Sequence, residues 1–430
     1  MNINLERYIG RCDCGKKHGL LTKKIIIESG AKNQLAKVAR SLGLRNQGII
    51  ICDTNTRPFA EECVKVLDGY LQKSCNMIVL NATGLHADEK AVTILENDLP
   101  KDTGWLLAAG SGTIHDITRY VAHERGINFI AFPTAATVDG FVSTVSAMTW
   151  YGFKKTLPGI APLAVVADTN IFAAAPYRLT ASGIGDVLGK YTSLVDWEIS
   201  HLVSGEAFCP RIAAITREAA DRVRANLRAI RNGNPETLEN LMYALLLSGI
   251  AMQMWGNSRP ASGAEHHLSH LWEMDCLNSH IDAFHGEKVG VGLLLVLAEY
   301  HRIAALEQVG SYPFYAGIPH DFLREKLGRL YSDIAKENIP DPLAGIEPVK
   351  VEALLPKIQK LLSGLPDPVE MAAEMEIARC YTRLHEIGLP NDILPDSLCI
   401  SPFVRNRLTM MRLRQILTES AHVSLYGKRN

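Results

Sequence analysis

The stretch "WLLAAGSGTIHDITRYVAHERGINFIAFP", residues 105–133, decides the fold class of this chain. It opens with a continuous apolar run, turns at Gly110 and Gly112, continues with the spacing of an amphipathic helix and closes with a second apolar run. Apolar runs that do not alternate with polar residues are typical of parallel strands covered by helices on both faces. The stretch therefore predicts one strand–helix–strand unit of a doubly wound α/β sheet.

The same pattern extends on both sides of that unit. The further apolar runs are "KKIIIESG" (23–30), "GIIICD" (48–53), "NMIVLN" (76–81) and "LAVVAD" (163–168). Past residue 176 the strand signals fade and long helical stretches follow. We expect an N-terminal extension over residues 1–22, a Rossmann-like α/β domain over 23–175, and an all-α domain over 176–430. Ligands of open α/β sheets bind at the carboxyl ends of the strands, so the expected site is a cleft between the two domains.

Composition narrows the class of protein. The 430 residues are 47% hydrophobic and 21% charged, with a formal net charge of −1, which is ordinary for a globular protein large enough for two domains. The chain has no long run of Lys or Arg that would favour nucleic acid. Its N-terminal stretch lacks the apolar segment of a signal peptide, and no later apolar run is long enough to span a membrane. We therefore expect a cytoplasmic protein with reduced cysteines and a small or mildly anionic ligand.

The N-terminal segment "CDCGKKH", residues 12–18, offers three metal ligands, Cys12, Cys14 and His18. The sequence shows no fourth ligand for a tetrahedral ion. The favoured interpretation is the turn of an N-terminal hairpin with Gly15 at its tip.

A histidine cluster lies in "NSRPASGAEHHLSHLWEM", residues 257–274. On a helix His266 and His270 share one face. His285 opens "HGEKVGVG", and Asp186 lies in "ASGIGDVLGKY". A single histidine would more often be a core or capping residue. One Asp with two or three His, however, can hold a divalent ion that keeps a position open for substrate.

Two loops after predicted strands indicate nucleotide and substrate contacts. In "AAGSGTIHD", residues 108–116, the amides that open a helix can hold a pyrophosphate, although the stretch is not a GxGxxG fingerprint. Asp53 could accept a hydrogen bond from a ribose hydroxyl or cap the helix that follows. In "FPTAATVDGFVSTVSAM", residues 132–148, small hydroxyl residues surround Asp139, which could bind a polar substrate; a solvated loop is the alternative.

Taken together, these segments resemble the metal-dependent alcohol dehydrogenase superfamily, which includes glycerol dehydrogenase and, by fold, dehydroquinate synthase. Within it they are most similar to the sn-glycerol-1-phosphate dehydrogenases of the bacterial arabinose-operon type. The matching blocks are "GSGTIHDITRY", "FPTAATVDGF", "GIGDVLGKYTSLVDW", "SRPASGAEHHLSH" and "FHGEKVGVG". The resemblance implies a dehydroquinate synthase-like fold; the part after about residue 310 matches only loosely.

The resemblance also implies a role for each matching residue. Asp186, His266 and His285 would bind zinc or nickel, His270 would contact the substrate, and Asp139 would bind the glycerol part. Because histidine titrates near working pH, we also expect His270, or a water that it holds, to pass a proton to the substrate. The residues implied in binding NAD(H) or NADP(H) are Asp53, Gly110, Gly112, Thr113, Ile114, His115, Asp116, Thr134, Thr137 and Ser143.

The implied reaction is the reversible, metal-dependent reduction of dihydroxyacetone phosphate to sn-glycerol 1-phosphate by a homodimer or a higher homo-oligomer. A guanidinium fork suits phosphate, so we predict that Arg259 binds the substrate phosphate with help from Lys154 or Lys155. Surface charge is the alternative interpretation of each lysine.

Three alternatives stay open at this point. One is a dehydrogenase of another small polyol or sugar phosphate. Another is a lyase of the dehydroquinate synthase kind, which would need more Lys and Arg than the motifs offer. The third is a nucleotide-binding sensor, which would have no chemical need for the Asp–His–His set.

Overall fold

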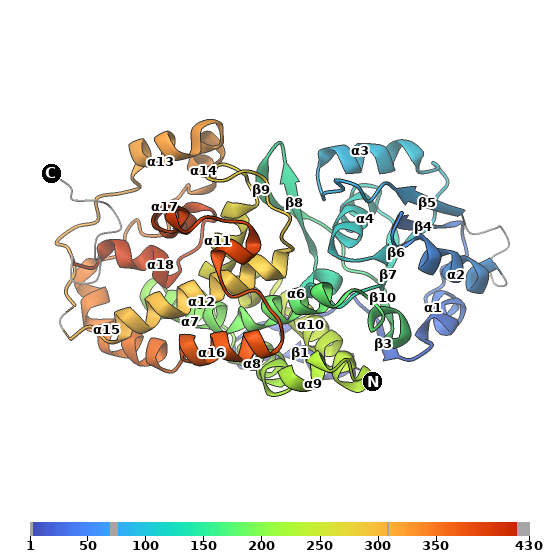
Figure 1. Cartoon of the computed structure of the whole chain (residues 1–430), viewed down its shortest axis with the longest axis horizontal. Helices are drawn as coiled ribbons and strands as arrows, with labels where there is room; N and C mark the ends of the chain where they lie inside the picture. The colour runs from blue at the N-terminus through green and yellow to red at the C-terminus, as the bar shows by residue number, and fades with distance from the viewer. Residues whose placement is uncertain (1–2, 69–75, 308, 419–430) are drawn as a thin grey trace.

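The computed structural model describes residues 3–68, 76–307 and 309–418, and it has an α/β half and a helical half (Figure 1). The α/β half is built on a six-stranded parallel sheet with the strand order β3-β10-β7-β6-β4-β5. Its strands are β3 (Lys24–Glu28), β4 (Gly48–Asp53), β5 (Asn76–Leu80), β6 (Trp105–Gly110), β7 (Asn128–Pro133) and β10 (Ala164–Asp168). Every apolar run predicted as a strand forms one, and the predicted fold class is confirmed.

Alternate residues of these strands enter two separate cores, which explains the continuous apolar runs. Ile26 and Ile50 pack on one face with the helices α1 (Leu35–Ser41) and α2 (Arg57–Asp68). Ile27 and Ile51 pack on the other face with α3 (Glu89–Asp98) and α4 (Gly112–Glu124). Figure 1 shows α1 and α2 on one side of the sheet and α3 and α4 on the other.

An antiparallel hairpin interrupts the strand–helix pattern between β7 and β10. It consists of β8 (Val145–Trp150) and β9 (Phe153–Pro158), in a region where the sequence predicts only a loop. Tyr151 and Gly152 form its tip with positive φ angles. In Figure 1 the hairpin stands between the sheet and the helical half. Its residues Ala147, Thr149 and Lys154 line a cleft there.

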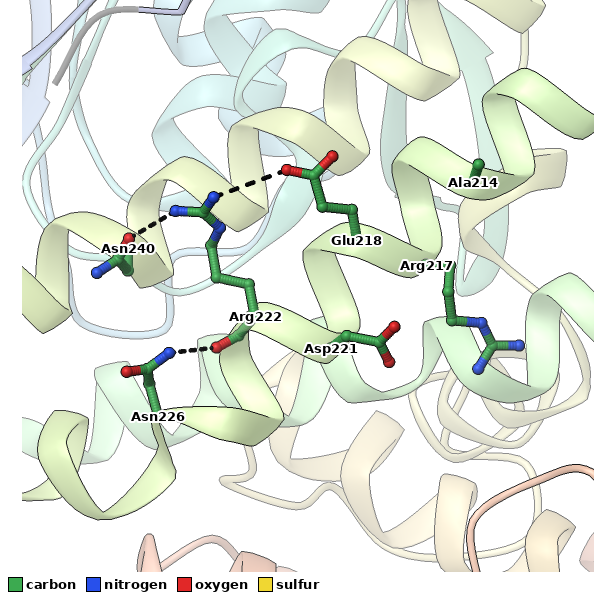
Figure 2. Close-up of a pocket in the computed structure, with 7 residues that line it drawn as sticks. All are labelled: Ala214, Arg217, Glu218, Asp221, Arg222, Asn226 and Asn240. Atoms are coloured by element: carbon green, nitrogen blue, oxygen red, sulfur yellow. Dashed lines mark hydrogen bonds and ion pairs between the residues drawn. The ribbon is translucent and has the colours of Figure 1, made fainter.

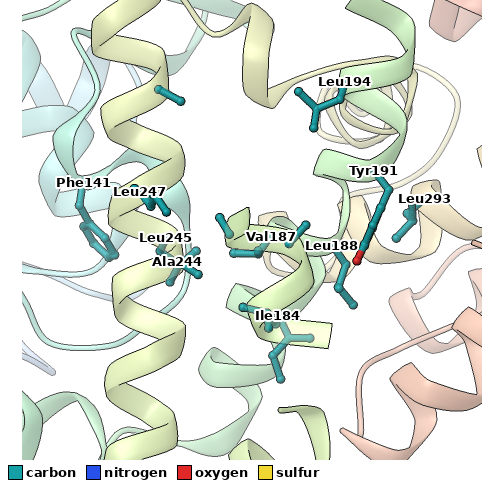
Figure 3. Close-up of a cluster of buried hydrophobic side chains, with 14 of the residues drawn as sticks. Phe141, Ile184, Val187, Leu188, Tyr191, Leu194, Ala244, Leu245, Leu247 and Leu293 are labelled. Atoms are coloured by element: carbon teal, nitrogen blue, oxygen red, sulfur yellow. The ribbon is translucent and has the colours of Figure 1, made fainter. Parts of the chain in front are cut away.

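The helical half begins after α5 (Thr169–Phe172). Its helices are α6 (Tyr177–Leu188), α7 (Lys190–Ser204), α8 (Pro210–Ala225), α9 (Leu227–Arg231), α10 (Pro235–Trp255), α11 (Ala264–Trp272), α12 (His285–Ala304), α13 (His320–Leu327), α14 (Tyr331–Glu337), α15 (Pro348–Ser363), α16 (Pro368–Ile377), α17 (Leu394–Ile400) and α18 (Met410–Leu413). Figure 3 shows part of its core, where Leu245 of α10 faces Ile184 and Val187 of α6. Across the described residues, none of the helices has both the length and the apolar composition to cross a membrane.

Two glycines allow α6 and α12 to cross with their backbones in contact. A Cβ on Gly185 would lie 2.2 Å from the carbonyl oxygen of Gly286, and a Cβ on Gly286 would lie 1.9 Å from that of Ser182. Real side chains cannot approach so closely, so only glycine fits at these positions. The crossing brings Asp186 and His285, the sequence neighbours of these glycines, to the same place.

The N-terminal segment packs on the helical half. Strands β1 (Gly10–Arg11) and β2 (Lys17–His18) pair as a hairpin, and Gly15 in its turn has φ +82°. The predicted hairpin is therefore confirmed. His18 contacts the end of α10, and Cys12 contacts the residue that precedes α8.

Candidate active site

A cleft of about 1190 Å³ lies between the carboxyl ends of the parallel strands and the helical half. The α/β half contributes Asp53 and Gly112 to its walls, and the helical half contributes Asp186 and His285. The cleft is therefore where the sequence placed the expected site.

Three side chains converge on the helical wall of this cleft. Asp186 of α6, His266 of α11 and His285 at the start of α12 each offer a ligand atom, and these atoms lie within 4.8 Å of one another. Nε2 of His266 is 3.5 Å from a carboxylate oxygen of Asp186. The spacing and the nitrogen and oxygen donors suit a divalent transition metal.

Two carboxylates orient the histidines of this set. Nδ1 of His266 is 2.7 Å from Glu265, and Nδ1 of His285 is 2.9 Å from Glu273. An ionised carboxylate only accepts, so each Nδ1 carries the proton and each Nε2 keeps a lone pair for a metal. Burial is the largest single effect and raises the pKa of Glu265, but the hydrogen bond and the charge of His266, with hydrogen bonds from Thr192 and the Gly263 N–H, together outweigh burial and lower the pKa overall. The residues present therefore fit a metal ion.

Lys190 of α7 is a buried cation beside the metal set. Its Nζ is 2.7 Å from Asp186 Oδ1 and 2.8 Å from Asp139 Oδ2, and it donates to the Ala261 carbonyl at 3.0 Å. Burial disfavours its charge, but the two carboxylates raise its pKa above the ordinary value. The sequence analysis missed Lys190, although its i+4 spacing from Asp186 was a readable signal.

Asp139 stands beside the metal set as well. Its backbone N–H donates to Asp186 Oδ2 at 3.0 Å, and its own carboxylate accepts from Ser248 Oγ at 2.8 Å. It opens the short 3₁₀ helix η3 (Asp139–Val142) and lines the cleft. A substrate hydroxyl could therefore reach it.

His270 borders the set without joining it. Its ring stacks on that of His285 at 5.6 Å between centroids and is 6.1 Å from that of His266. Burial lowers the pKa of His270 well below 6.5, and the Arg405 guanidinium lowers it further. His270 is thus uncharged at neutral pH, and within the described part of the chain its Nδ1 has no partner.

A second hollow lies on the surface of α8, at about 690 Å³ (Figure 2). Its charged groups pair with one another or with nearby side chains: Arg222 is 3.7 Å from Glu218, and Asp221 accepts from Tyr191 at 2.6 Å. It contains none of the predicted site residues. We therefore assign the site to the larger cleft.

The sequence is similar to a known family and to individual known proteins. Residues 26–176 match the iron-containing alcohol dehydrogenase family. A glycerol-1-phosphate dehydrogenase [NAD(P)+] of Geobacillus thermodenitrificans is 31% identical over 96% of this chain and 97% of its own length. Another, from Bacillus velezensis, is 34% identical over 90% of this chain and 89% of its own length. The chain belongs to the glycerol-1-phosphate dehydrogenase family. The resemblance and the expectation of an oxidoreductase are both confirmed.

Solved structures agree on the fold. A probable glycerol dehydrogenase from Sinorhizobium meliloti superposes with a TM-score of 0.59 at 19% identity, over 89% of this chain and 88% of that one. An iron-containing alcohol dehydrogenase from Thermotoga maritima gives 0.56 at 14% identity, over 89% and 91%. Identities this low speak for the fold alone.

Most of the residues that the sequence analysis predicted to bind the nucleotide line the cleft. They are Asp53, Gly112, Thr113, Ile114, Asp116, Thr134, Thr137 and Ser143. Asp53 Oδ1 also accepts from the backbone N–H groups of Asn55 and Thr56, both at 2.8 Å, so its capping interaction is present too.

Gly110 and His115 do not line the cleft, which corrects their predicted role. The His115 ring is buried in edge-on contact with Phe141, at 4.9 Å between centroids, and its Nδ1 lies 2.8 Å from the Ser111 carbonyl oxygen. A Cβ on Gly110 would lie 2.6 Å from Ile114, so this glycine serves the close packing of α4 on β6.

The structure corrects the predicted phosphate ligand Arg259. Its guanidinium is buried, pairs with Glu206 at 3.0 Å, and donates to the carbonyls of Asp196 at 3.1 Å and Leu408 at 2.8 Å. It does not line the cleft. A guanidinium used for internal bonds is not available to a substrate.

Lys155 also faces away from the cleft and lies 3.5 Å from Asp333. Its neighbour Lys154 lines the cleft and pairs with Glu273 at 2.9 Å. Successive side chains of a strand point to opposite faces, so β9 can present only one of the two lysines.

Two arginines that the sequence analysis missed stand behind the same wall. Arg407 donates to the Ser262 carbonyl at 2.9 Å and to Ser258 Oγ at 2.8 Å, and Arg405 donates to the Lys154 carbonyl at 2.5 Å. All three acceptor residues line the cleft. Burial, with Arg259 and Arg405 nearby, lowers the pKa of Arg407 to about 9. Among the described residues neither Arg405 nor Arg407 forms a direct ion pair. The nearest carboxylates that act on their charges are those of Glu337 and Glu273 for Arg405, and of Glu206 and Glu265 for Arg407.

Proposed function

We propose that this protein catalyses the reversible, NAD(P)H-dependent reduction of dihydroxyacetone phosphate to sn-glycerol 1-phosphate with the help of a divalent metal ion. The main observation behind this proposal is that Asp186, His266 and His285 face the same cleft as the start of α4. The names of the relatives support a dehydrogenase that uses NAD(P) and favour it over the lyase.

The residues around the set divide the work. When bound, the metal would act as a Lewis acid on the ketone and the nicotinamide would supply the hydride. Glu265 and Glu273 fix the histidine tautomers, and Lys190 holds the carboxylates of Asp186 and Asp139 in place. The carboxylate of Asp139 is available to a substrate hydroxyl.

In this proposal His270 supplies the proton for the reduced substrate oxygen. Because it is uncharged, it can give its N–H proton to the reduced substrate oxygen only if its other nitrogen takes one from water. Its position beside His285 places it within the reach of a substrate in the cleft.

We propose that the substrate phosphate lies against the wall of Lys154, Ser258 and Ser262. Lys154 offers an ammonium to the cleft, and the guanidinium groups of Arg405 and Arg407 raise the potential behind it. Charge-assisted hydrogen bonds are among the strongest available to a phosphate. This location replaces the predicted one at Arg259.

The finer assignments are part of the same proposal. We propose zinc or nickel as the ion and a cytoplasmic homodimer as the working form. We also propose that the product serves as a phospholipid head group. We propose further that residues 23–175 form the dinucleotide-binding domain and residues 176–430 the metal- and substrate-binding domain. Asp53 would contact the cofactor.

Oxidation of NADH and NADPH by metal-analysed protein tests the function. Dihydroxyacetone phosphate would be compared with dihydroxyacetone, after chelation and after readdition of zinc or nickel. We expect strong preference for the phosphorylated ketone and activity that returns with the metal. If metal-loaded protein turns over neither ketone, another polyol phosphate or the lyase reaction replaces this proposal.

A further inference from the structure

Four side chains that can bind a metal meet at a second place in the fold, and none of them lines the candidate active-site cleft. Cys12, Cys14 and His18 come from the N-terminal hairpin, and Cys209 is the residue directly before α8. Their ligand atoms lie within 4.8 Å of one another. The fourth ligand that the sequence did not show is thus supplied by Cys209, 197 positions from Cys12.

The distances match the edges of a tetrahedron around zinc. Zinc lies about 2.3 Å from sulfur and about 2.0 Å from imidazole nitrogen, which separates two sulfurs by about 3.8 Å and sulfur from nitrogen by about 3.6 Å. Here the sulfurs of Cys12 and Cys209 are 3.6 Å apart. Nε2 of His18 is 3.3 Å from the sulfur of Cys14 and 3.5 Å from that of Cys209.

His18 is oriented as a metal ligand. Its Nδ1 is 2.9 Å from the carbonyl oxygen of Met254, an acceptor, so Nδ1 carries the proton and Nε2 turns its lone pair toward the three sulfurs. A backbone carbonyl on the far nitrogen is a usual second partner of metal-bound histidine. The side chain is also buried, so water does not compete for that lone pair.

We propose that Cys12, Cys14, His18 and Cys209 bind a structural zinc ion, separate from the active-site metal. Three thiolates and one imidazole fill a tetrahedral shell, so no position stays open for a substrate, and soft sulfur ligands select zinc over magnesium or manganese. The site is structural for that reason.

The ion ties the N-terminal segment to the junction of the two halves. Directly after the hairpin, Gln253 of α10 accepts from the backbone N–H of Leu21 at 3.0 Å and donates to Thr22 Oγ1 at 2.7 Å. The same amide donates to the Val142 carbonyl at 2.6 Å, in the 3₁₀ helix that begins with Asp139. Zinc therefore fixes a segment that joins α10, the loop of Asp139 and the start of β3.

Cobalt substitution of the full-length protein separates this site from the active-site set. Cobalt bound to thiolates gives an intense near-ultraviolet charge-transfer band, and the Asp186, His266 and His285 set has no sulfur to produce it. We expect the band in the wild type and in a His266→Ala variant, whose active-site set is incomplete. We expect its intensity to fall by at least half in Cys14→Ser and to stay unchanged in Cys276→Ser, a partly buried cysteine outside the cluster.

Zinc content gives the second measurement. In protein stripped of metal and reloaded with zinc alone, we expect about two equivalents per chain in the wild type and about one in both Cys14→Ser and His266→Ala. No thiolate band in cobalt-loaded wild type, or equal zinc content in Cys14→Ser and Cys276→Ser, would overturn the proposal. A thiol count that shows Cys12 and Cys209 joined as a disulfide would overturn it too. Neither readout depends on the dehydrogenase reaction.

Discussion

Gly185 and Gly286 touch backbone to backbone where α6 crosses α12, since a methyl group on Gly185 would lie 2.2 Å from the carbonyl oxygen of Gly286. Each glycine is the sequence neighbour of a proposed metal ligand, Asp186 or His285. The contact between the helices therefore sets the distance between the two ligands.

Gly185→Ala should push the two helices apart. We expect a loss of about 1–3 kcal/mol in the free energy of unfolding, as for other overpacked cores, together with a loss of bound metal. Chemical denaturation and metal analysis measure both. Gly364→Ala is the control, because its nearest atoms are 3.5 Å away and its φ is not positive. Full metal content in Gly185→Ala would show that the crossing does not set the site.

Glu265→Gln should weaken metal binding without removing a ligand. A glutamine can donate to Nδ1 of His266, which moves the imidazole proton to Nε2 and blocks the lone pair that faces Asp186. We expect a 10–100-fold higher dissociation constant, as is typical when an outer partner is lost. Competition with a coloured chelator measures it.

The matched control for that variant is Glu299→Gln. Glu299 is also a mostly buried carboxylate, paired with Arg302 and Arg414, but it lies roughly 21 Å further along α12 from His285. An equal effect of the two substitutions would assign the loss to general destabilisation.

The sequence was sufficient to predict those features of the fold and the site that depend on a local pattern of residues. The strands were readable because residues such as Ile26 and Ile27 enter cores on opposite faces, which leaves a continuous apolar run. Asp186, His266 and His285 were readable because each stands in a distinctive motif. These signals need no knowledge of which segments meet.

Contacts between distant segments were not readable. Arg407 donates to Ser258 across 149 positions, and Cys209 reaches His18 across 191. Whether Lys154 or Lys155 points into the cleft depends on which face of β9 is turned toward it. The polar and apolar residues of β9 do not alternate clearly, so the sequence did not indicate that face. Arg259 looked available only because its partner Glu206 lies in another segment.

Lys190→Met should widen the gap in melting temperature between metal-loaded and chelated protein. Without the ammonium, Asp139 and Asp186 are left as buried, uncompensated carboxylates, which costs about 3–5 kcal/mol in the metal-free form. A bound divalent ion neutralises these carboxylates again, and in the variant it no longer competes with the Lys190 ammonium. Differential scanning fluorimetry with and without chelator measures the gap; a gap equal to that of the wild type would contradict the assigned role.

Lys154→Met should raise the KM for dihydroxyacetone phosphate about 10-fold or more, the value of a charged hydrogen bond. The KM for dihydroxyacetone should change little at saturating metal, because that ketone has no phosphate. Lys155→Met is the control, since Lys155 faces Asp333 instead of the cleft. If both lysine variants have the same KM for dihydroxyacetone phosphate, the substrate phosphate binds elsewhere.

Acid stability should depend on Glu273. Burial raises its pKa, but Lys154, Lys288 and His285 outweigh burial and hold it well below 4.5 in the folded protein. The unfolded chain therefore binds the proton more readily, so this carboxylate stabilises the fold above about pH 4.5 and the contribution is lost as pH falls toward the folded pKa. In metal-free protein, Glu273→Gln should melt at a lower temperature than the wild type near neutral pH and show a shallower decline below about pH 4.5. Parallel slopes for the two proteins over that acid range would mean that the carboxylate is not held ionised by its neighbours.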